Sequence, residues 1–366
     1  MKQKSGFSGQ IGFVLAAAGS AVGVGNLWRF PYLAAKDGGG LFLIIYLVLV
    51  LTVGFTLLTT DIAIGRKTGK SAIYAYESMR KKWKFLGVIT FIVPVIIMTY
   101  YAVIGGWILK YITIYILGSG KEAVADNCFT NFITSPSSVW YGIVFMLLTA
   151  IIVYNGVEKG IERVSKFIMP VLLVMVVGIA IFSLTLKTTL DDGTVRTGLQ
   201  GLKVYLTPDM SGITVQKFLQ VSLDAMSQLF FSLSVSMGIM ITYGSYVKKD
   251  VNLNKAVSQI EIMDTGVAFL AGMMIIPAVF VFSGLDGMSA GPGLMFVSLP
   301  NVFFRMGMAG RIVGLLFFLL AGFAALTSCI SVLESIAANC MELFHTERKK
   351  TTLALAVIYL AATAPT

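Results

Sequence analysis

The sequence predicts an all-α protein that crosses a membrane several times. Of its 366 residues, 57% are hydrophobic and only 13% are charged, about half the charged share of an ordinary globular chain. Long apolar segments recur from one end to the other, and many reach the roughly 20 residues that one crossing needs. These observations exclude a water-soluble globular protein. The informative residues are then the few polar ones inside the apolar segments, because burying them in a membrane is costly.

Hydropathy divides the chain into nine predicted spans. They cover residues 11–35, 41–65, 86–117, 139–155, 165–186, 217–246, 257–284 and 311–344, with a ninth starting near 351. Several are longer than one crossing requires, which predicts tilt or interruption. The sequence ends in Ala-Pro-Thr inside span 9, so we expect a fragment of a longer protein, truncated in that span.

Basic residues predict the orientation of the spans. Lys and Arg gather before span 1 and in the connections between spans 2 and 3, 4 and 5, 6 and 7, and 8 and 9, all on one side. The positive-inside rule makes this side cytoplasmic, together with the N-terminus, in the inner (cytoplasmic) membrane of the cell. The net charge of +10 therefore reflects topology and does not indicate nucleic-acid binding.

The connections on the opposite side differ in composition. Residues 118–138 and 187–216 are rich in Gly, Ser, Thr and Pro, as loops are. Residues 286–308 are half apolar, and the sequence leaves open whether they form a re-entrant hairpin or a plain loop.

The sequence contains no pattern that predicts catalysis. His345 is the only histidine, and there is no Ser/His/Asp set and no phosphate-binding loop. The cysteines, Cys128, Cys329 and Cys340, are not spaced as metal ligands. We therefore do not expect an enzyme.

Span 1 is predicted to break in its middle. Residues 16–26 read Ala-Ala-Ala-Gly-Ser-Ala-Val-Gly-Val-Gly-Asn, and each glycine weakens a helix by roughly 1 kcal/mol relative to alanine. Backbone groups freed at membrane depth must bind protein, water or a ligand. The stretch therefore predicts a site that uses bare carbonyl and amide groups.

Spans 6, 7 and 8 carry the other unusual polar residues. Span 6 contains Gln228 and a dense set of serines that favours local hydrogen bonding and a second break: Ser232, Ser234 and Ser236. In span 7, Asp264 is either a cation ligand or a helix-end carboxylate near the cytoplasmic face. In span 8, Thr327 and Ser328 are adjacent hydroxyls, which are more often interhelical hydrogen bonds than an ion site. Two interrupted spans in corresponding halves of a chain indicate the central site of a transporter, and the ligand types suit a hard cation such as Na⁺.

The stretch Gly19–Tyr32, GSAVGVGNLWRFPY, followed by Gly38-Gly39-Gly40, closely resembles the signature of the bacterial branch of the neurotransmitter:sodium symporter family. Residues 230–234, 241–246 and 326–328 fit the same family. The resemblance implies a five-plus-five inverted-repeat transporter fold with broken spans 1 and 6. The first repeat would be residues 1–186, the extracellular loop 187–216, and an incomplete second repeat 217–366. The implied activity is sodium-coupled uptake of amino acids or related amines by alternating access.

The resemblance also implies two sodium sites and a substrate site. The first sodium site would use Ala21, Asn26, Ser232 and Asp264, with the substrate carboxylate as a further ligand. The second would use Gly19, Val22, Ala324, Thr327 and Ser328. The residues expected around the substrate are Ser20, Ala21, Val24, Gly25, Ile97, Tyr101, Phe231, Ser232, Ser234, Met237, Ser328 and Val332.

Departures from the family pattern refine what we expect for chloride dependence and for the substrate. Many members carry Asn at the position of Asp264 and need chloride or a nearby Glu, so the fixed charge of Asp264 predicts that chloride is not required. Met237 replaces a common aromatic residue, and Ser236 stands where relatives usually have Gly, which we expect to shrink the pocket. We expect a neutral, hydrophobic L-amino acid, and the identity of the amino acid and the oligomeric state stay open.

Gate residues follow from the same resemblance. Lys4 and Glu342 match an intracellular ion pair supported by Tyr246, and Arg29 matches the extracellular gate. The partners implied are a small amino acid and membrane lipid, with no nucleic acid. Two alternatives remain: a truncated amino-acid-binding membrane fragment that does not transport, and a proton-coupled carrier in which Asp264 takes the proton.

Overall fold

Six helices are long and apolar enough to cross a membrane in the computed structural model, which describes residues 6–190 and 193–363. They cover Gly40–Thr68, Lys81–Ile116, Pro136–Tyr154, Val157–Thr185, Leu253–Ser283 and Met308–Phe344. A seventh crossing is a bent pair, α1 (Gln10–Ala21) and α2 (Val24–Lys36), with an angle of 53° between its halves. The remaining predicted spans are represented by shorter helices.

The long helices contain several elements. Gly40–Thr68 consists of α3 (Gly40–Leu49), the π-helix η1 (Val50–Gly54) and α4 (Phe55–Thr68), and α5 (Ala72–Met79) follows it. The next two crossings are η2 (Lys81–Trp83) with α6 (Lys84–Ile116), and α9 (Pro136–Tyr154). Then come η3 (Val157–Glu162) with α10 (Arg163–Thr185), α14 (Leu253–Ser283) and α16 (Met308–Phe344).

Predicted spans 6 and 9 take other forms. The segment predicted as span 6 contains α12 (Val215–Ser232) and α13 (Ile239–Gly244), with no helix between them. Span 9 corresponds to α17 (Arg348–Thr363). The helices around spans 4, 5 and 7 begin before the predicted starts, because their first turns carry polar residues that hydropathy excludes from a span.

The connections contain more structure than their composition suggests. Residues 118–138 include α7 (Gly120–Ala123) and α8 (Cys128–Ile133). The segment 187–216 forms an antiparallel hairpin of β1 (Lys187–Thr189) and β2 (Val195–Thr197), with Lys187 opposite Thr197, and then α11 (Gly198–Leu206).

The segment 286–308 is not a plain loop. After η4 (Leu285–Gly287) it forms η5 (Leu294–Ser298) and α15 (Leu299–Arg305), a short apolar helix that packs on α16. Phe296 is buried and stacks on Phe129 with ring centroids 4.9 Å apart. Of the two alternatives that the sequence left open for this segment, the plain loop is therefore wrong.

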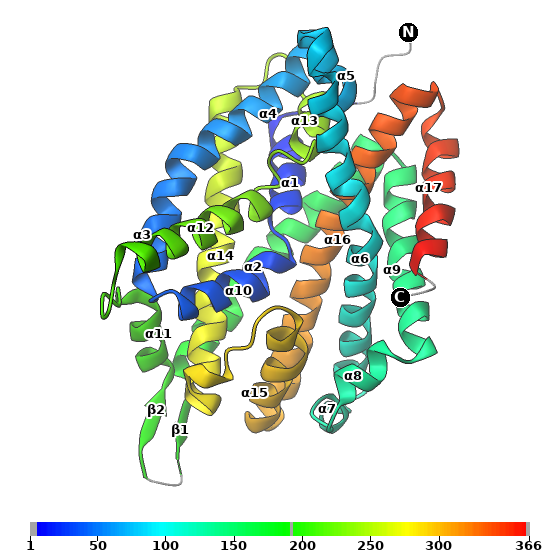
Figure 1. Cartoon of the computed structure of the whole chain (residues 1–366). Coiled ribbons are helices and arrows are strands. Elements are labelled where there is room, and N and C mark those ends of the chain that lie inside the picture. Colours follow the sequence, from blue (N-terminus) through cyan, green and yellow to red (C-terminus); the bar gives the residue numbers. More distant parts are fainter. Residues whose placement is uncertain (1–5, 191–192, 364–366) are drawn as a thin grey trace.

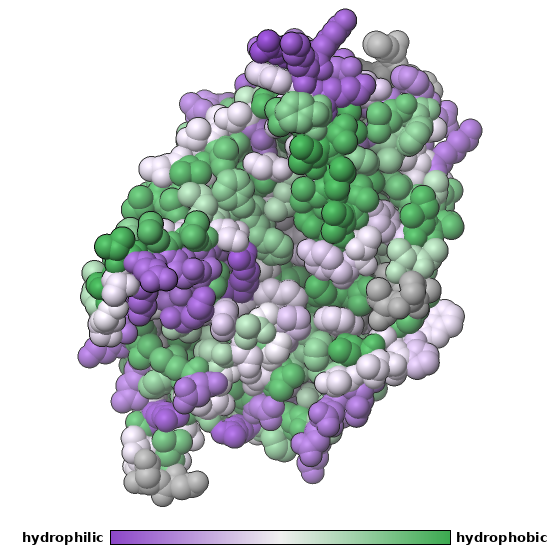
Figure 2. Space-filling model, viewed as in Figure 1, coloured by the Kyte–Doolittle hydropathy of each residue, from purple (hydrophilic) through white to green (hydrophobic). Residues whose placement is uncertain are grey.

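Helix α1 lies in the middle of the bundle, against α10, α14 and α16 (Figure 1). Nearly all of its small residues are buried, which lets the neighbouring helices approach its backbone closely. The outside of the bundle shows broad hydrophobic areas, as a lipid-facing surface requires (Figure 2). The break between α1 and α2 and the break between α12 and α13 meet in this interior, next to α14 and α16.

Candidate functional site

The first break separates α1 from α2 and exposes backbone groups at the centre of the protein. Helix α1 ends at Ala21, and the Gly23 N–H donates to Asn26 Oδ1 at 3.1 Å, which caps the start of α2. The Ser20 carbonyl, freed by the break, accepts hydrogen bonds from Ser328 Oγ at 3.1 Å and Ser234 Oγ at 3.3 Å. Side chains from spans 8 and 6 therefore bind the broken end of span 1.

Two glycines in this break are required by close approach. A Cβ on Gly23 would lie 2.9 Å from Ser328 Oγ and 3.2 Å from the Tyr101 hydroxyl. A Cβ on Gly25 would lie 2.4 Å from the ring of Phe231. Both glycines therefore allow side chains of the predicted substrate site to contact the backbone of span 1.

The second break runs from the end of α12 to the start of α13. Its backbone takes positive φ at Ser234 (53°), Ser236 (60°) and Gly238 (73°), a conformation that L-residues other than glycine rarely adopt. The Ser236 N–H donates to Asp61 Oδ2 at 2.8 Å, and Asp61 is buried in α4. A carboxylate from span 2 therefore holds this break.

Asp61 is a functional candidate that our reading of the sequence missed. Its signal was available, since it is an acidic residue inside a predicted span, where ionisable groups are rare and usually functional.

The side chain of Ser236 is exposed, and it does not line the cavity that lies between the two breaks. The expectation that Ser236 shrinks the pocket is therefore wrong.

Asp264 joins the two breaks. Its Oδ1 accepts from Asn26 Nδ2 at 2.8 Å, and Ser232 Oγ lies 2.9 Å from both carboxylate oxygens. The side chains of Asn26, Ser232 and Asp264 are buried. Ala21 lies, with Asn26 and Ser232, in the wall of a cavity between the two breaks. The structure therefore brings together the four residues predicted for the first sodium site. It also places Asp264 in the interior of the bundle and not at a helix end.

The residues predicted for the second sodium site also converge. Ser328 Oγ lies 3.4 Å from the Val22 carbonyl, and Thr327 Oγ1 donates to the Ala324 carbonyl at 3.2 Å. Gly19 faces Thr327, with the Thr327 Cβ 3.2 Å from where a Gly19 Cβ would lie. This group consists of neutral oxygens on α16 and at the broken end of span 1.

A cavity lies between the two breaks. Its wall contains ten of the twelve residues predicted around the substrate: Ser20, Ala21, Ile97, Tyr101, Phe231, Ser232, Ser234, Met237, Ser328 and Val332. Gly25 lies behind the ring of Phe231, and Val24 is buried without lining the cavity.

The wall also contains residues that we had not assigned to the substrate: Gly23, Asn26, Ile239 and Ser331. Ser331 is one helical turn after Ser328, so helical spacing could have indicated it. The Ser20 and Ser331 hydroxyls are 2.7 Å apart, which adds a buried polar contact to the cavity.

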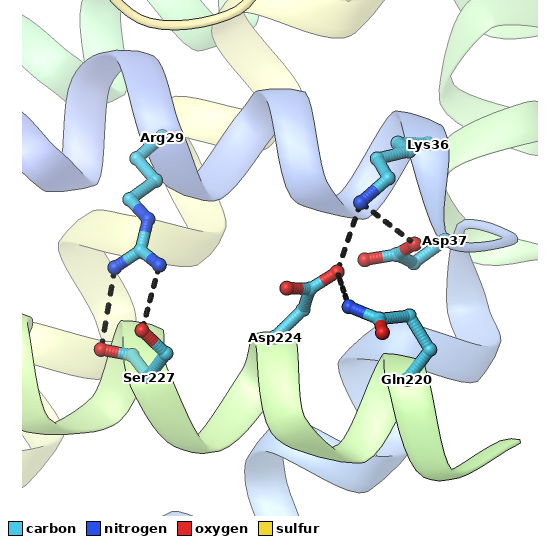
Figure 3. A network of polar contacts seen from close by, with 6 residues as sticks. All are labelled: Arg29, Lys36, Asp37, Gln220, Asp224 and Ser227. Atoms are coloured by element: carbon cyan, nitrogen blue, oxygen red, sulfur yellow. Dashed lines mark hydrogen bonds and ion pairs between the residues drawn. The ribbon is translucent and has the colours of Figure 1, made fainter. Parts of the chain in front are cut away.

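On the side of the cavity formed by α2 and α12, charged residues connect the two helices (Figure 3). Arg29 donates to the Ser227 carbonyl at 3.3 Å and to Ser227 Oγ at 2.8 Å. Lys36 Nζ lies 2.9 Å from Asp224 Oδ2 and 3.9 Å from Asp37. Burial raises the pKa of Asp37 to about 6, and Lys36 acts against this shift. Arg29 therefore has partners within this chain.

At the opposite end lie the described residues of the predicted intracellular gate, Glu342 and Tyr246. Lys4 lies outside the described residues, and the Glu342 carboxylate accepts from the Ser71 N–H at 3.0 and 3.1 Å. Tyr246 donates to Glu334 at 2.6 Å.

Glu334 is fully buried and forms an ion pair with Arg348 at 2.5 Å. Glu334 and Arg348 were not predicted. Glu334 could have been indicated by its position inside apolar span 8.

Comparisons with known proteins identify relatives of this chain. The sequence matches the model of the sodium:neurotransmitter symporter family over residues 4–135 and 130–364. An uncharacterized sodium-dependent transporter from Bacillus subtilis is 36% identical over 350 residues, which are 94% of this chain and 74% of the relative. Another from Haemophilus influenzae is 34% identical over 381 residues, 100% of this chain and 80% of the relative. A crystal structure of MhsT in complex with L-phenylalanine has a TM-score of 0.86 and 39% identity, covering 99% of this chain and 80% of that one.

Proposed function

Because the chain belongs to the sodium:neurotransmitter symporter family, whose members are sodium-dependent transporters and not enzymes, we propose that it is a sodium-coupled symporter. Its substrate is a neutral, hydrophobic L-amino acid, taken up by alternating access. The observation that carries the proposal is the position of Asp264, which hydrogen-bonds to Asn26 beside the first break and to Ser232 beside the second. A ligand at Asp264 therefore interacts with both halves of the protein at once.

We assign two sodium ions to the two groups of oxygens. The first ion binds at Ala21, Asn26, Ser232 and Asp264, where the carboxylate supplies charge. The second binds among the carbonyls of Gly19, Val22 and Ala324 and the hydroxyls of Thr327 and Ser328. Hard cations prefer such oxygen ligands, and the buried setting makes each ion interaction stronger than it is in water.

The substrate carboxylate meets the start of α2, near Gly25. The first N–H groups of a helix lack partners within it and favour an anion. The hydroxyl of Tyr101, which lies beside Gly23, donates to the same carboxylate. The ammonium group meets the carbonyls freed at the ends of α1 and α12, near Ala21 and Phe231.

The substrate side chain lies against the apolar part of the cavity wall, formed by Ile97, Phe231, Met237 and Val332. Met237 is flexible and can adapt to side chains of different shape. The L-phenylalanine complex of MhsT supports an amino acid as the substrate class.

Chloride is not required in this proposal. Asp264 carries a fixed negative charge next to Tyr46 and Ser232, and residue 268 is an alanine. The Gln228 amide is buried and makes no hydrogen bond within the described part of the chain. A second anion near Asp264 would be repelled by it, since like charges inside a protein interact strongly.

For the two repeats, the orientation of the chain and the membrane that holds it, we propose what the sequence predicts. We assign residues 1–186 and 217–366 to the two repeats. The N-terminus lies on the cytoplasmic side of the inner membrane, because the basic connections all lie on that side.

Two measurements on the reconstituted chain test the proposal. Binding of radiolabelled neutral L-amino acids is compared in NaCl, KCl and sodium gluconate at one pH, and uptake into proteoliposomes is then measured in the same salts. We expect sodium-dependent binding and uptake that gluconate does not reduce. Equal binding in sodium and potassium contradicts sodium coupling, and dependence on pH alone favours the proton-coupled alternative. Sodium-dependent binding without uptake identifies the non-transporting fragment.

A further inference from the structure

A hollow at the basic end of the protein lies apart from the central cavity. It has a volume of about 470 Å³ and is lined by Ala63, Arg66, Lys67 and Lys249. The cations come from the end of α4 and from the connection between α13 and α14, segments that are far apart in the sequence. The fold therefore gathers three positive charges around one space large enough for several water molecules or a headgroup.

This hollow lies at the level where lipid headgroups are expected. Arg66 and Lys67 are in the last turn of the apolar segment Gly40–Thr68, and Lys249 precedes the apolar helix that begins at Leu253. Helices α4 and α14 pack against each other below it. In Figure 2 the upper end of the molecule is mostly hydrophilic, with hydrophobic surface below. The lining cations therefore sit at the ends of membrane-crossing helices.

The part of the chain that the structure describes does not neutralise the positive charge of the hollow. Arg66 Nη1 donates to the Val251 carbonyl at 2.7 Å, which orients the guanidinium and leaves donors for a ligand. Within the described residues, Arg66, Lys67 and Lys249 form no ion pair. Among residues 6–190 and 193–363, no acidic side chain lines the hollow, and Asp250, next in sequence to Lys249, is exposed.

We propose that this hollow binds the headgroup of an anionic phospholipid of the surrounding bilayer. The phosphate lies between the oriented Arg66 guanidinium and the ammonium groups of Lys67 and Lys249, and Ala63 leaves room for it. Basic pockets between membrane helices bind anionic headgroups, and arginine suits the planar geometry of phosphate oxygens. The acyl chains extend along the membrane faces of α4 and α14, where Ile262 is 71% exposed.

Native mass spectrometry of the chain released from nanodiscs that contain phosphatidylglycerol and phosphatidylcholine tests this site. The variant Lys67→Gln/Lys249→Gln keeps Arg66 and its contact with Val251, so the fold is least disturbed. We expect its affinity for phosphatidylglycerol to fall about 30-fold, since each cation near a membrane surface contributes about a fivefold effect. Lys67→Arg/Lys249→Arg restores binding.

The matched control is Lys81→Gln/Lys82→Gln, which removes the same charge from exposed residues outside the hollow. We expect it to retain phosphatidylglycerol like the unmodified chain, and we expect 10 mM inorganic phosphate not to displace the lipid. An equal loss in the control and the hollow variant overturns the proposal, because general surface charge then explains the binding. Displacement by inorganic phosphate, or no preference for phosphatidylglycerol over phosphatidylcholine, also overturns it.

Discussion

The two helix breaks at the centre of the protein are built in different ways. Between α1 and α2 the break is two residues long, and glycines lie in and next to it. Between α12 and α13 it is six residues long, and two of its three positive-φ residues are serines. The first break caps itself through Asn26, whereas the second depends on Asp61, which is more than 170 residues away in the sequence.

This difference separates local from tertiary causes. In the first break the residue types themselves disfavour a helix, and a nearby side chain satisfies the freed N–H. In the second, serines occupy a conformation that costs an L-residue about 1–2 kcal/mol, so contacts from other helices must hold it. We infer that the second break is the one whose conformation depends more on its surroundings.

The variant Asp264→Ala should have the largest effect, because Asp264 is the residue that both breaks share. It removes the acceptor for Asn26 and Ser232 and the charge of the first sodium site. Hydrogen bonds to a charged group contribute about 1.5–3 kcal/mol each, so we expect sodium-dependent substrate binding to weaken at least about 100-fold. Equilibrium binding of the radiolabelled amino acid in NaCl measures the change.

The conservative variant Asp264→Asn separates charge from shape. It keeps an acceptor oxygen near Ser232 and removes the negative charge. We expect binding that becomes chloride-dependent or is lost. Binding that stays strong in sodium gluconate contradicts the assignment of charge compensation to Asp264.

The variant Asp61→Ala should damage the second break and spare the first. It leaves the partly buried Ser236 N–H without its acceptor, and an unsatisfied donor that water does not fully reach costs about 1–3 kcal/mol. We expect the free energy of unfolding in detergent to fall by about 2 kcal/mol and substrate affinity to fall about tenfold.

The control for Asp61 is Asp61→Asn, which keeps one carbonyl oxygen at the same place and should recover most of the loss. Thermal unfolding in detergent, followed by tryptophan fluorescence, measures the change for both variants. If both variants behave like the unmodified chain, Asp61 does not hold the break.

The variant Gly25→Ala perturbs the first break by overpacking. The added methyl group would overlap the Phe231 ring and push it toward the cavity. Overpacking of this kind costs about 1–3 kcal/mol, so we expect a roughly tenfold loss of substrate affinity. Gly266→Ala in α14 is the matched control, because nothing lies within 4 Å of its added Cβ. Similar losses for the two variants would show that the effect is not specific to Phe231.

Much of the central site could be predicted from local features. Three features contradict the composition of an apolar span: the glycines before Asn26, the serines of span 6 and the carboxylate of Asp264. The resemblance to a family supplied their roles. The structure then placed these residues next to one another.

The missed residues share a different property. Asp61 and Glu334 each act through one partner distant in sequence, Ser236 and Arg348 or Tyr246, and no local spacing identifies such a partner. Similarly, composition assigned residues 187–216 to a loop, because a three-residue strand paired in a hairpin is too short to give a periodic pattern. Tertiary pairing is thus what the single sequence leaves undetermined.

The variant Ser236→Gly should have the smallest effect and the opposite sign. The Ser236 side chain is exposed and does not line the cavity, while its φ of 60° suits glycine. We expect the free energy of unfolding to rise by up to about 1 kcal/mol with unchanged substrate affinity. Ser234→Gly relieves a similar φ of 53° but removes a hydroxyl that donates to Ser20 and lines the cavity, so its affinity should fall. A destabilised Ser236→Gly would mean that the second break is not strained, and that its serines are chosen for their hydroxyls.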